Sequence, residues 1–215
     1  MVRIRQEDTA APLIPEQHTL PALKQAAAGC RACPLWERGT QTVFGDGLPT
    51  SRLILVGEQP GDQEDRQGLP FVGPAGRVLD QALEIAGIER SDAYVTNVVK
   101  HFKWIAVGKR RLHQKPNSRE IGACLPWLDA EIDLIRPQVL VAMGSTAAQA
   151  LLGKEVLVTR DHGLLMESNR ASYAMATIHP SAILRMQTEE ERHAAMDLFV
   201  TDLSAVAEVL RRNVS

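Results

Sequence analysis

The stretch RLILVGEQPGDQEDRQGLPF, residues 52–71, joins a short apolar run to a loop rich in glycine and carboxylates. The run RLILV has the length and the continuous apolar character of a strand that is buried on both faces of a sheet. Similar runs, separated by helical patterns, occur at residues 93–99, 139–143 and 173–178. Strands that alternate with helices predict an α/β fold, here a three-layer α/β/α sandwich whose mostly parallel central sheet has about four main strands.

The rest of the chain fits a single domain of ordinary size. Residues 1–18 are polar and predict a flexible N-terminal tail, and residues 19–215 are predicted to form the domain. Short apolar runs at 157–158 and 163–166 predict a β-hairpin. Helical patterns are present at residues 20–28, 75–86, 118–135 and 189–211.

Positive charge is concentrated in one segment of a chain whose formal net charge is -2. No Asp or Glu occurs between Ala93 and Arg119, and GKRRLHQKP at 108–116 is the densest basic run. A charge run is most often a solvated loop, but this one lies close to Trp104 and contains His113, and nucleic-acid sites mix cations with flat rings. The segment therefore predicts a docking loop for an anion, although the net charge gives no argument for nucleic acid from the protein as a whole.

The sequence shows no sign of membrane insertion or secretion. No apolar run reaches the roughly 18 residues that a membrane span needs, and the N-terminus lacks the apolar core of a signal peptide. We therefore expect a soluble, cytoplasmic protein that has no membrane partner. No feature of the sequence demands more than a monomer.

Four loops should meet at one edge of the predicted sheet, because ligands bind beyond the shared carboxyl ends of parallel strands. They are the loop at 57–71, the segment after Asn97, GSTA at 144–147 and HPS at 179–181. The first of them lacks the lysine and hydroxyl of a phosphate-binding loop. An amide such as Asn97 suits reading the edge of a nucleobase, whereas a lone histidine such as His179 is more often structural than catalytic.

The chain has three cysteines, and an odd number without a leader argues against a disulfide framework. Cys30 and Cys33 form a C-x-x-C pair, while His101 and Cys124 flank the basic segment. Three thiols and an imidazole suit either zinc or an iron–sulfur cluster. A metal that ties both ends would brace the basic loop. The alternative is three unrelated thiols.

Three stretches together resemble the uracil-DNA glycosylase superfamily: GEQPGDQEDRQGLPFVGPAGRVLD, TNVVKHFK and HPS. The basic run KRRLH is similar to the KRRIH-type insertion of the UdgX branch, with Leu112 where isoleucine is usual. This branch is related to the iron–sulfur family 4 enzymes, and His101 stands at the position of their third cysteine. The resemblance therefore implies a 4Fe-4S cluster held by Cys30, Cys33, His101 and Cys124.

The resemblance implies a DNA repair activity that recognises uracil in DNA, preferably in single strands, and breaks the bond between base and deoxyribose. The base must leave the stack to be reached. By resemblance, Phe71 stacks on the uracil ring, Asn97 reads its polar edge and Gln59 helps to line the same pocket. His179 hydrogen-bonds a uracil carbonyl and stabilises charge as the base departs.

The UdgX branch also implies a suicide reaction, in which a loop histidine, here His113, attacks the anomeric carbon and leaves a protein–DNA bond. Glu58 would orient that ring and stabilise the imidazolium, as a carboxylate does for a catalytic histidine, and Asp62 would place water or shape the loop. Three cations would hold DNA phosphates, namely Lys109, Arg110 and Arg111. The alternatives are an ordinary multiple-turnover uracil-DNA glycosylase and a metal-braced single-strand DNA-binding module without chemistry.

Overall fold

A four-stranded sheet forms the centre of the computed structural model, which describes residues 5 and 8–212. Its strands are β1 (Leu53–Gly57), β2 (Ala93–Asn97), β5 (Val139–Met143) and β6 (Tyr173–Thr177). The strand order is β2-β1-β5-β6, and every neighbouring pair is parallel. The register pairs Gly57 with Asn97 and Met143 with Thr177. The carboxyl ends of the strands therefore meet at one edge of the sheet, as predicted.

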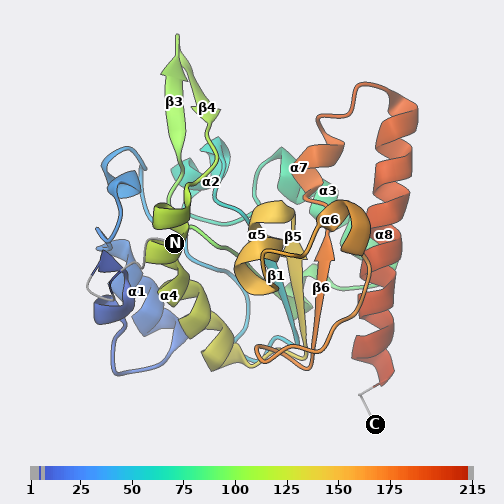
Figure 1. The fold of residues 1–215 in the computed structure, drawn as a ribbon, viewed down its shortest axis with the longest axis horizontal. Coiled ribbons are helices and arrows are strands. Elements are labelled where there is room, and N and C mark those ends of the chain that lie inside the picture. Colours follow the sequence, from blue (N-terminus) through green and yellow to red (C-terminus); the bar gives the residue numbers. More distant parts are fainter. Residues whose placement is uncertain (1–4, 6–7, 213–215) are drawn as a thin grey trace.

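Helices cover both faces of this sheet (Figure 1). They are α1 (Leu20–Ala28), α2 (Asp62–Gln67), α3 (Pro74–Ala86), α4 (Ser118–Ile135), α5 (Ser145–Leu151), α6 (Val158–Asp161), α7 (Pro180–Ile183) and α8 (Glu189–Arg212), with short 3-10 turns at Ala11–Leu13, Pro34–Glu37 and Arg90–Asp92. Successive strand side chains point to opposite faces. Ile54 and Val56 join the apolar core with α1, α4 and α5, whereas Leu53 and Leu55 join the core with α3 and α8.

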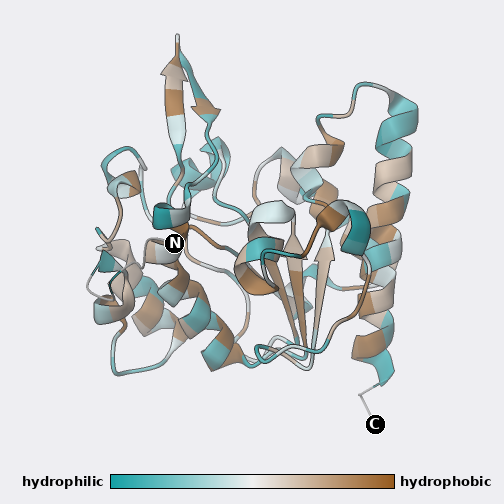
Figure 2. Cartoon of the chain, viewed as in Figure 1, coloured by the Kyte–Doolittle hydropathy of each residue, from teal (hydrophilic) through white to brown (hydrophobic). Residues whose placement is uncertain are grey.

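The three-layer α/β/α sandwich predicted from the sequence is confirmed by this arrangement. Figure 2 shows the apolar colour that runs along the central strands between the two helical layers. The continuous apolar runs in the sequence therefore reflect strands that are buried on both faces. No helix within the described part of the chain is long and apolar enough to cross a membrane.

The segment after α5 differs from its prediction. The hairpin expected at 157–158 and 163–166 is wrong, because Val158–Asp161 forms the single turn of α6. The Asp161 carboxylate accepts the N–H of Leu157 at 2.9 Å and closes that turn. The residues that follow pair with β6 instead, where Met166 and Ala174 exchange backbone hydrogen bonds of 2.8 and 2.7 Å. β6 is an edge strand of the sheet, and this segment forms hydrogen bonds with backbone groups of β6 that no other strand pairs.

The basic segment forms a hairpin rather than an irregular loop. β3 (Trp104–Val107) and β4 (Arg110–His113) pair antiparallel as a separate two-stranded sheet. Figure 1 shows them projecting beyond the body of the protein. Gly108 has a φ of 59°, which suits the first central position of a type II′ two-residue turn. Residues 104–113 belong to neither apolar core.

The N-terminal segment contacts the domain at one buried residue. Ala10 has no exposed surface, and its N–H donates to the Ala123 carbonyl of α4 at 2.8 Å. The expected flexible tail over residues 1–18 falls partly on residues 1–4, 6 and 7, which lie outside the described residues.

Candidate active site

A cavity of about 720 Å³ lies beyond the carboxyl edge of the sheet. The chain leaves β1 toward β2 on one side and later enters β5 on the other side, which opens a crevice between the ends of β1 and β5. Each of the loops expected at this edge contributes to the cavity wall. The lining side chains that carry polar or aromatic chemistry include Glu58, Gln59, Asp62, Phe71, Asn97, His113, Thr146 and His179.

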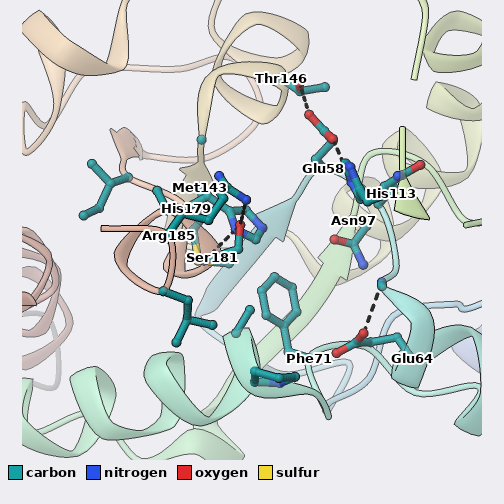
Figure 3. A pocket seen from close by; sticks show the side chains of 18 of the residues that line it. Glu58, Glu64, Phe71, Asn97, His113, Met143, Thr146, His179, Ser181 and Arg185 are labelled. Atoms are coloured by element: carbon teal, nitrogen blue, oxygen red, sulfur yellow. Dashed lines mark hydrogen bonds and ion pairs between the residues drawn. The ribbon is translucent and has the colours of Figure 1, made fainter. Parts of the chain in front are cut away.

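The Phe71 ring forms part of the wall, and neighbouring glycines make its position possible. Its backbone φ is 54°, an unusual value for a bulky residue. A Cβ on Gly76 would lie 1.7 Å from the Phe71 carbonyl oxygen, and a Cβ on Gly57 would lie 2.7 Å from the Phe71 ring. The ring and the His179 imidazole are stacked, with their centroids 5.9 Å apart. Phe71 thus presents a flat apolar surface in the cavity (Figure 3).

Asn97 ends β2 with an acceptor that has no partner. The residue is 2% exposed, and among the described residues its Oδ1 atom has no hydrogen bond. Leaving a buried acceptor unpaired costs on the order of 1–3 kcal/mol. Because this oxygen belongs to a cavity-lining side chain, a donor on a bound ligand is the partner that would remove this cost.

His179 is a neutral donor at the same cavity. Its Nδ1 accepts the Ser181 N–H at 3.1 Å and lies 2.8 Å from Ser181 Oγ. Burial lowers the pKa of His179 to about 4, so the ring is uncharged at neutral pH. Since Nδ1 accepts a hydrogen bond, the single ring proton is on Nε2. His179 can therefore donate one hydrogen bond from Nε2 to a ligand.

Glu58 and His113 meet at the side of the cavity where β4, the returning strand of the hairpin, ends. Glu58 Oε1 is 3.2 Å from His113 Nε2, and Glu58 Oε2 accepts a hydrogen bond from Thr146 Oγ1 (Figure 3). Burial acts to raise the pKa of Glu58, but hydrogen bonds from His113 and Thr146 and the nearby imidazoles hold that pKa below its usual value. Glu58 is therefore ionised at neutral pH. The His113 side chain is 51% exposed and open to a substrate.

Gln59 lines the cavity, but its side chain mainly holds the hairpin. Its Nε2 donates to the carbonyls of Lys103 at 3.3 Å and Gln114 at 3.0 Å, and its Oε1 accepts the Lys103 N–H at 3.1 Å. Lys103 precedes β3 and Gln114 follows β4, so one amide ties together both ends of the hairpin. The side-chain amide of Gln59, which we expected to line the uracil pocket together with the Gln59 backbone, thus positions the element that carries His113.

The Arg111 guanidinium, which we predicted to hold a DNA phosphate, makes its ion pairs within the protein. It bonds to Asp62, and its Nη1 lies 2.7 Å from Asp65 Oδ2. The guanidinium also lies 5.4 Å from the centre of the Trp104 ring. Burial acts to raise the pKa of Asp62, but hydrogen bonds from Arg66 and Arg111 hold it below its usual value. Asp62 therefore anchors the hairpin to α2, which is the loop-shaping alternative considered for it.

The three cysteines are free thiols that lie close together. Burial raises the pKa of the Cys124 thiol to about 12, and negative charge on Cys33 or Cys30 acts in the same direction. Cys124 Sγ accepts the Lys100 N–H at 3.2 Å, and such hydrogen bonds tune metal-bound sulfurs. Within residues 5 and 8–212, no three His, Cys, Asp or Glu side chains are arranged to hold a single metal ion.

His101 keeps one ring nitrogen available. Thr42 Oγ1 donates to the Ala27 carbonyl at 3.0 Å, so its lone pair accepts the His101 Nε2–H at 3.0 Å. Burial lowers the pKa of His101, which keeps the ring neutral and leaves a lone pair on Nδ1. Metal-binding histidines commonly donate their second nitrogen in this way. Three thiols and a neutral imidazole are a donor set that fits an iron–sulfur cluster or zinc.

Comparison with known families decides the assignment. The family model described as the uracil DNA glycosylase superfamily matches residues 44–204. The chain belongs to the uracil DNA glycosylase superfamily. The matched range includes every cavity residue named above and His101 and Cys124, but it begins after Cys30 and Cys33.

Curated glycosylases of this superfamily resemble the chain over most of its length. A type-4 uracil-DNA glycosylase of Thermotoga maritima is 37% identical over 169 residues, which are 78% of this chain and 84% of the relative. A type-4 uracil-DNA glycosylase of Archaeoglobus fulgidus is 34% identical over 75% of this chain and 82% of the relative. A type-5 uracil-DNA glycosylase of Thermus thermophilus is 33% identical over 57% of this chain and 58% of the relative.

Several residues that shape the cavity of this glycosylase family member were not recognised from the sequence. Thr146 lies in GSTA, which the sequence indicated only as a loop at the shared strand edge. Gly76 carries no chemistry, and only the close approach of the Phe71 backbone shows why a side chain is excluded at this position. A signal was present for one strand of the hairpin, because the β-prone run WIAV directly precedes Gly108, whereas RRLH at 110–113 contains no β-branched residue and no Phe, Tyr or Trp.

Proposed function

We propose that this protein removes uracil from DNA, with single strands preferred, and then bonds covalently to the deoxyribose through His113. The observation that carries the proposal is the buried, unpartnered Oδ1 of Asn97 beside a flat ring and a neutral histidine donor. Membership of the glycosylase superfamily supports cleavage of the bond between base and sugar. The covalent step goes beyond the relatives and rests on the place of His113 beside Glu58.

Uracil offers polar groups that complement this cavity. Its N3–H is a donor for Asn97 Oδ1, and its O2 carbonyl is an acceptor for His179 Nε2–H. Cytosine carries an acceptor at N3 and would leave the Asn97 oxygen unpaired, a mismatch that discriminates strongly between ligands. Phe71 supplies the surface on which a base that has left the stack can lie.

The departing base is the group that most needs stabilisation. When the bond between uracil N1 and the sugar C1′ breaks, its electron pair goes to the base, and negative charge develops on the uracil carbonyls. The neutral His179 donates from Nε2 toward O2 and stabilises this charge, in the manner of an oxyanion hole. The uracil anion then takes a proton from solvent. A single preorganised donor of this kind is worth about 100- to 1000-fold in rate.

His113 supplies the nucleophile in the proposed second step. A ring nitrogen of the neutral imidazole gives its lone pair to C1′ of the sugar cation. The new C–N bond leaves a positive charge on the imidazolium, which the Glu58 carboxylate stabilises from 3.2 Å in the free protein. Each protein molecule reacts only once, because no group in this scheme breaks the new bond between His113 and C1′.

The tip of the hairpin contributes the proposed phosphate contacts. Lys109 and Arg110 are exposed at the turn, and cations there attract the DNA backbone without reading its sequence. Arg111 is left out of this role because its guanidinium is bonded to Asp62 and Asp65. It instead fixes the hairpin, and therefore His113, relative to the cavity.

We expect Gly57→Ala to slow uracil release by at least about tenfold, since displacements near 1 Å at a reacting centre are costly. The added Cβ would lie 2.4 Å from Asn97 Oδ1 and 2.7 Å from the Phe71 ring, so both ligand-binding groups must move. Release of free uracil from a uracil-containing single strand measures the effect. Gly29→Ala is the control, because its Cβ would meet nothing closer than 3.9 Å. Equal rates for both variants would contradict the assigned roles of Phe71 and Asn97.

A 4Fe-4S cluster held by Cys30, Cys33, His101 and Cys124 is the second part of the proposal. The free thiols, the N–H···S contact to Cys124 and the single available nitrogen of His101 support it. When bound, such a cluster braces the chain segments that carry its ligands and can hold an electron. Absorption in the blue, with matching iron and sulfide contents, is expected of the purified protein. Colourless protein with stoichiometric zinc would contradict the cluster.

The covalent function is tested by mixing excess protein with a labelled single strand that contains one uracil, boiling in detergent and running a denaturing gel. A shifted band that survives denaturation is the expected result. Unshifted DNA that breaks in alkali would instead identify an ordinary multiple-turnover glycosylase. Intact, unshifted DNA would indicate that the protein binds DNA without catalysing a reaction. A matched strand with thymine in place of uracil is the control and should remain unshifted.

A further inference from the structure

The Glu58 carboxylate is held on both sides by hydroxyl and imidazole partners from different loops. One oxygen, Oε1, faces His113 Nε2 at 3.2 Å, and the other, Oε2, accepts the hydrogen bond of Thr146 Oγ1. Glu58 directly follows β1, and Thr146 lies in the first turn of α5, directly after β5. This hydrogen bond therefore crosses the crevice between the two strand ends at which the chain changes direction in the sheet.

Thr146 is itself rigidly placed. Its residue surface is 4% exposed, and the next residues of α5, Ala147 and Ala148, have no exposed surface and belong to the apolar core. Its hydroxyl is thus fixed by a helix that cannot shift without disturbing the core. Glu58 by contrast is a longer side chain with 21% of its surface exposed, and without a second partner it can adopt other rotamers in the cavity.

We propose that Thr146 is a positioning residue that holds Glu58 in the one orientation in which its free oxygen faces His113. The inference rests on the proposed function of Glu58 and His113. A hydroxyl can donate to only one carboxylate oxygen at a time, so it selects which oxygen remains for the imidazole. The hydrogen bond also favours the ionised form of the carboxylate, which is the form that stabilises an imidazolium.

The charged and titratable groups that act on Glu58 are His113 on β4 and His179 at the start of α7. Burial raises the pKa of Glu58, whereas the hydrogen bonds of His113 and Thr146 lower it. Removing the Thr146 hydroxyl removes one of the two hydrogen bonds that oppose the effect of burial, so the pKa of Glu58 rises. The carboxylate is present above that pKa and is lost as pH falls through it. A smaller fraction of Glu58 is therefore ionised at acid pH once this hydroxyl is removed.

The test compares Thr146→Val, which keeps the shape and removes the hydroxyl, with Thr146→Ser, which keeps the hydroxyl. We expect Val to slow covalent capture about tenfold at neutral pH, as for the loss of one hydrogen bond to a charged group. Ser should restore the capture rate to near wild type. Thr201→Val on α8 is the control, because the Thr201 hydroxyl donates to the Asp197 carbonyl of its own helix at 2.8 Å.

Two further measurements separate this inference from the proposed function. Carboxyl NMR titration reports the pKa of Glu58 without DNA, and we expect it to rise in Thr146→Val and to stay in Thr146→Ser. In a Glu58→Gln background, Thr146→Val should have no further effect on capture, because the two residues act through one contact. An unchanged Glu58 titration, or equal losses for Val and Ser, would overturn the role of Thr146. A wild-type protein that forms no adduct would overturn the covalent function alone.

Discussion

The His113→Ser variant is expected to form no covalent DNA adduct while still releasing uracil. The serine side chain ends well short of the imidazole position, so no protein nucleophile reaches C1′ and water can take its place. The base-reading groups Asn97, Phe71 and His179 lie on other elements and keep their positions. The hairpin also keeps its anchor, since Arg111 remains bonded to Asp65. The denaturing gel and a uracil-release assay on the same sample measure both outcomes.

His193→Ser is the matched control for this variant, because His193 is an exposed histidine on α8. It should capture DNA at the wild-type rate. An adduct that persists in His113→Ser would show that another side chain is the nucleophile. Loss of uracil release together with capture would show that His113 also takes part in breaking the bond to the base.

Lys100→Met is expected to reduce the free energy of unfolding by about 3–5 kcal/mol, the usual cost of removing one partner from a buried ion pair. The side chains of Lys100 and Glu131 are 1% and 0% exposed, and their charged atoms are 2.6 Å apart. The Lys100 ammonium also donates to Thr96 Oγ1 at 2.6 Å and to the Asn97 carbonyl at 2.8 Å. Methionine leaves the Glu131 carboxylate buried without a cation. Urea unfolding followed by circular dichroism measures the loss.

Two comparisons show whether the unpaired buried charge of Glu131 causes the loss of stability. The double variant Lys100→Met/Glu131→Gln removes both charges but keeps an acceptor for the Gly45 N–H and the Tyr94 hydroxyl, so it should recover much of the lost stability. Lys103→Met breaks a pair with Glu120 in which the lysine side chain is 25% exposed, so it should cost less. A Lys100→Met variant as stable as the wild type, or a double variant no better than the single one, would contradict this account.

The main sheet could be predicted from the sequence because its strands are short apolar runs. In these runs polar and apolar residues do not alternate, which is the pattern of a strand that is buried on both faces. The edge at which Glu58, Asn97 and His179 gather followed from the same inference, since parallel strands share their carboxyl edge. The pairing of Glu58 with His113 was expected only as a possibility, and the distance of 3.2 Å supports it.

Contacts between distant segments could not be predicted from the sequence. Arg111 looks like its neighbour Arg110 in the sequence, and only the pairing of β3 with β4 and the nearby Asp65 distinguish them. In the same way, the Gln59 amide meets the ends of the hairpin 44 and 55 residues away. The failed hairpin after α5 has the same cause, because the partner of that segment is the edge of β6, which local pattern does not reveal.

The hairpin that carries His113 is structurally separable from the rest of the fold. Its residues belong to neither apolar core, and it returns to the body beside the residue it left, with Gln114 N–H bonded to the Lys103 carbonyl at 2.9 Å. A segment with such ends can be gained or lost in a gene without rebuilding the sheet. Within the proposed function, the groups that release uracil lie at the edge of the sheet and the nucleophile lies on a separate hairpin, so repeated catalysis and single capture differ by this hairpin rather than by the fold.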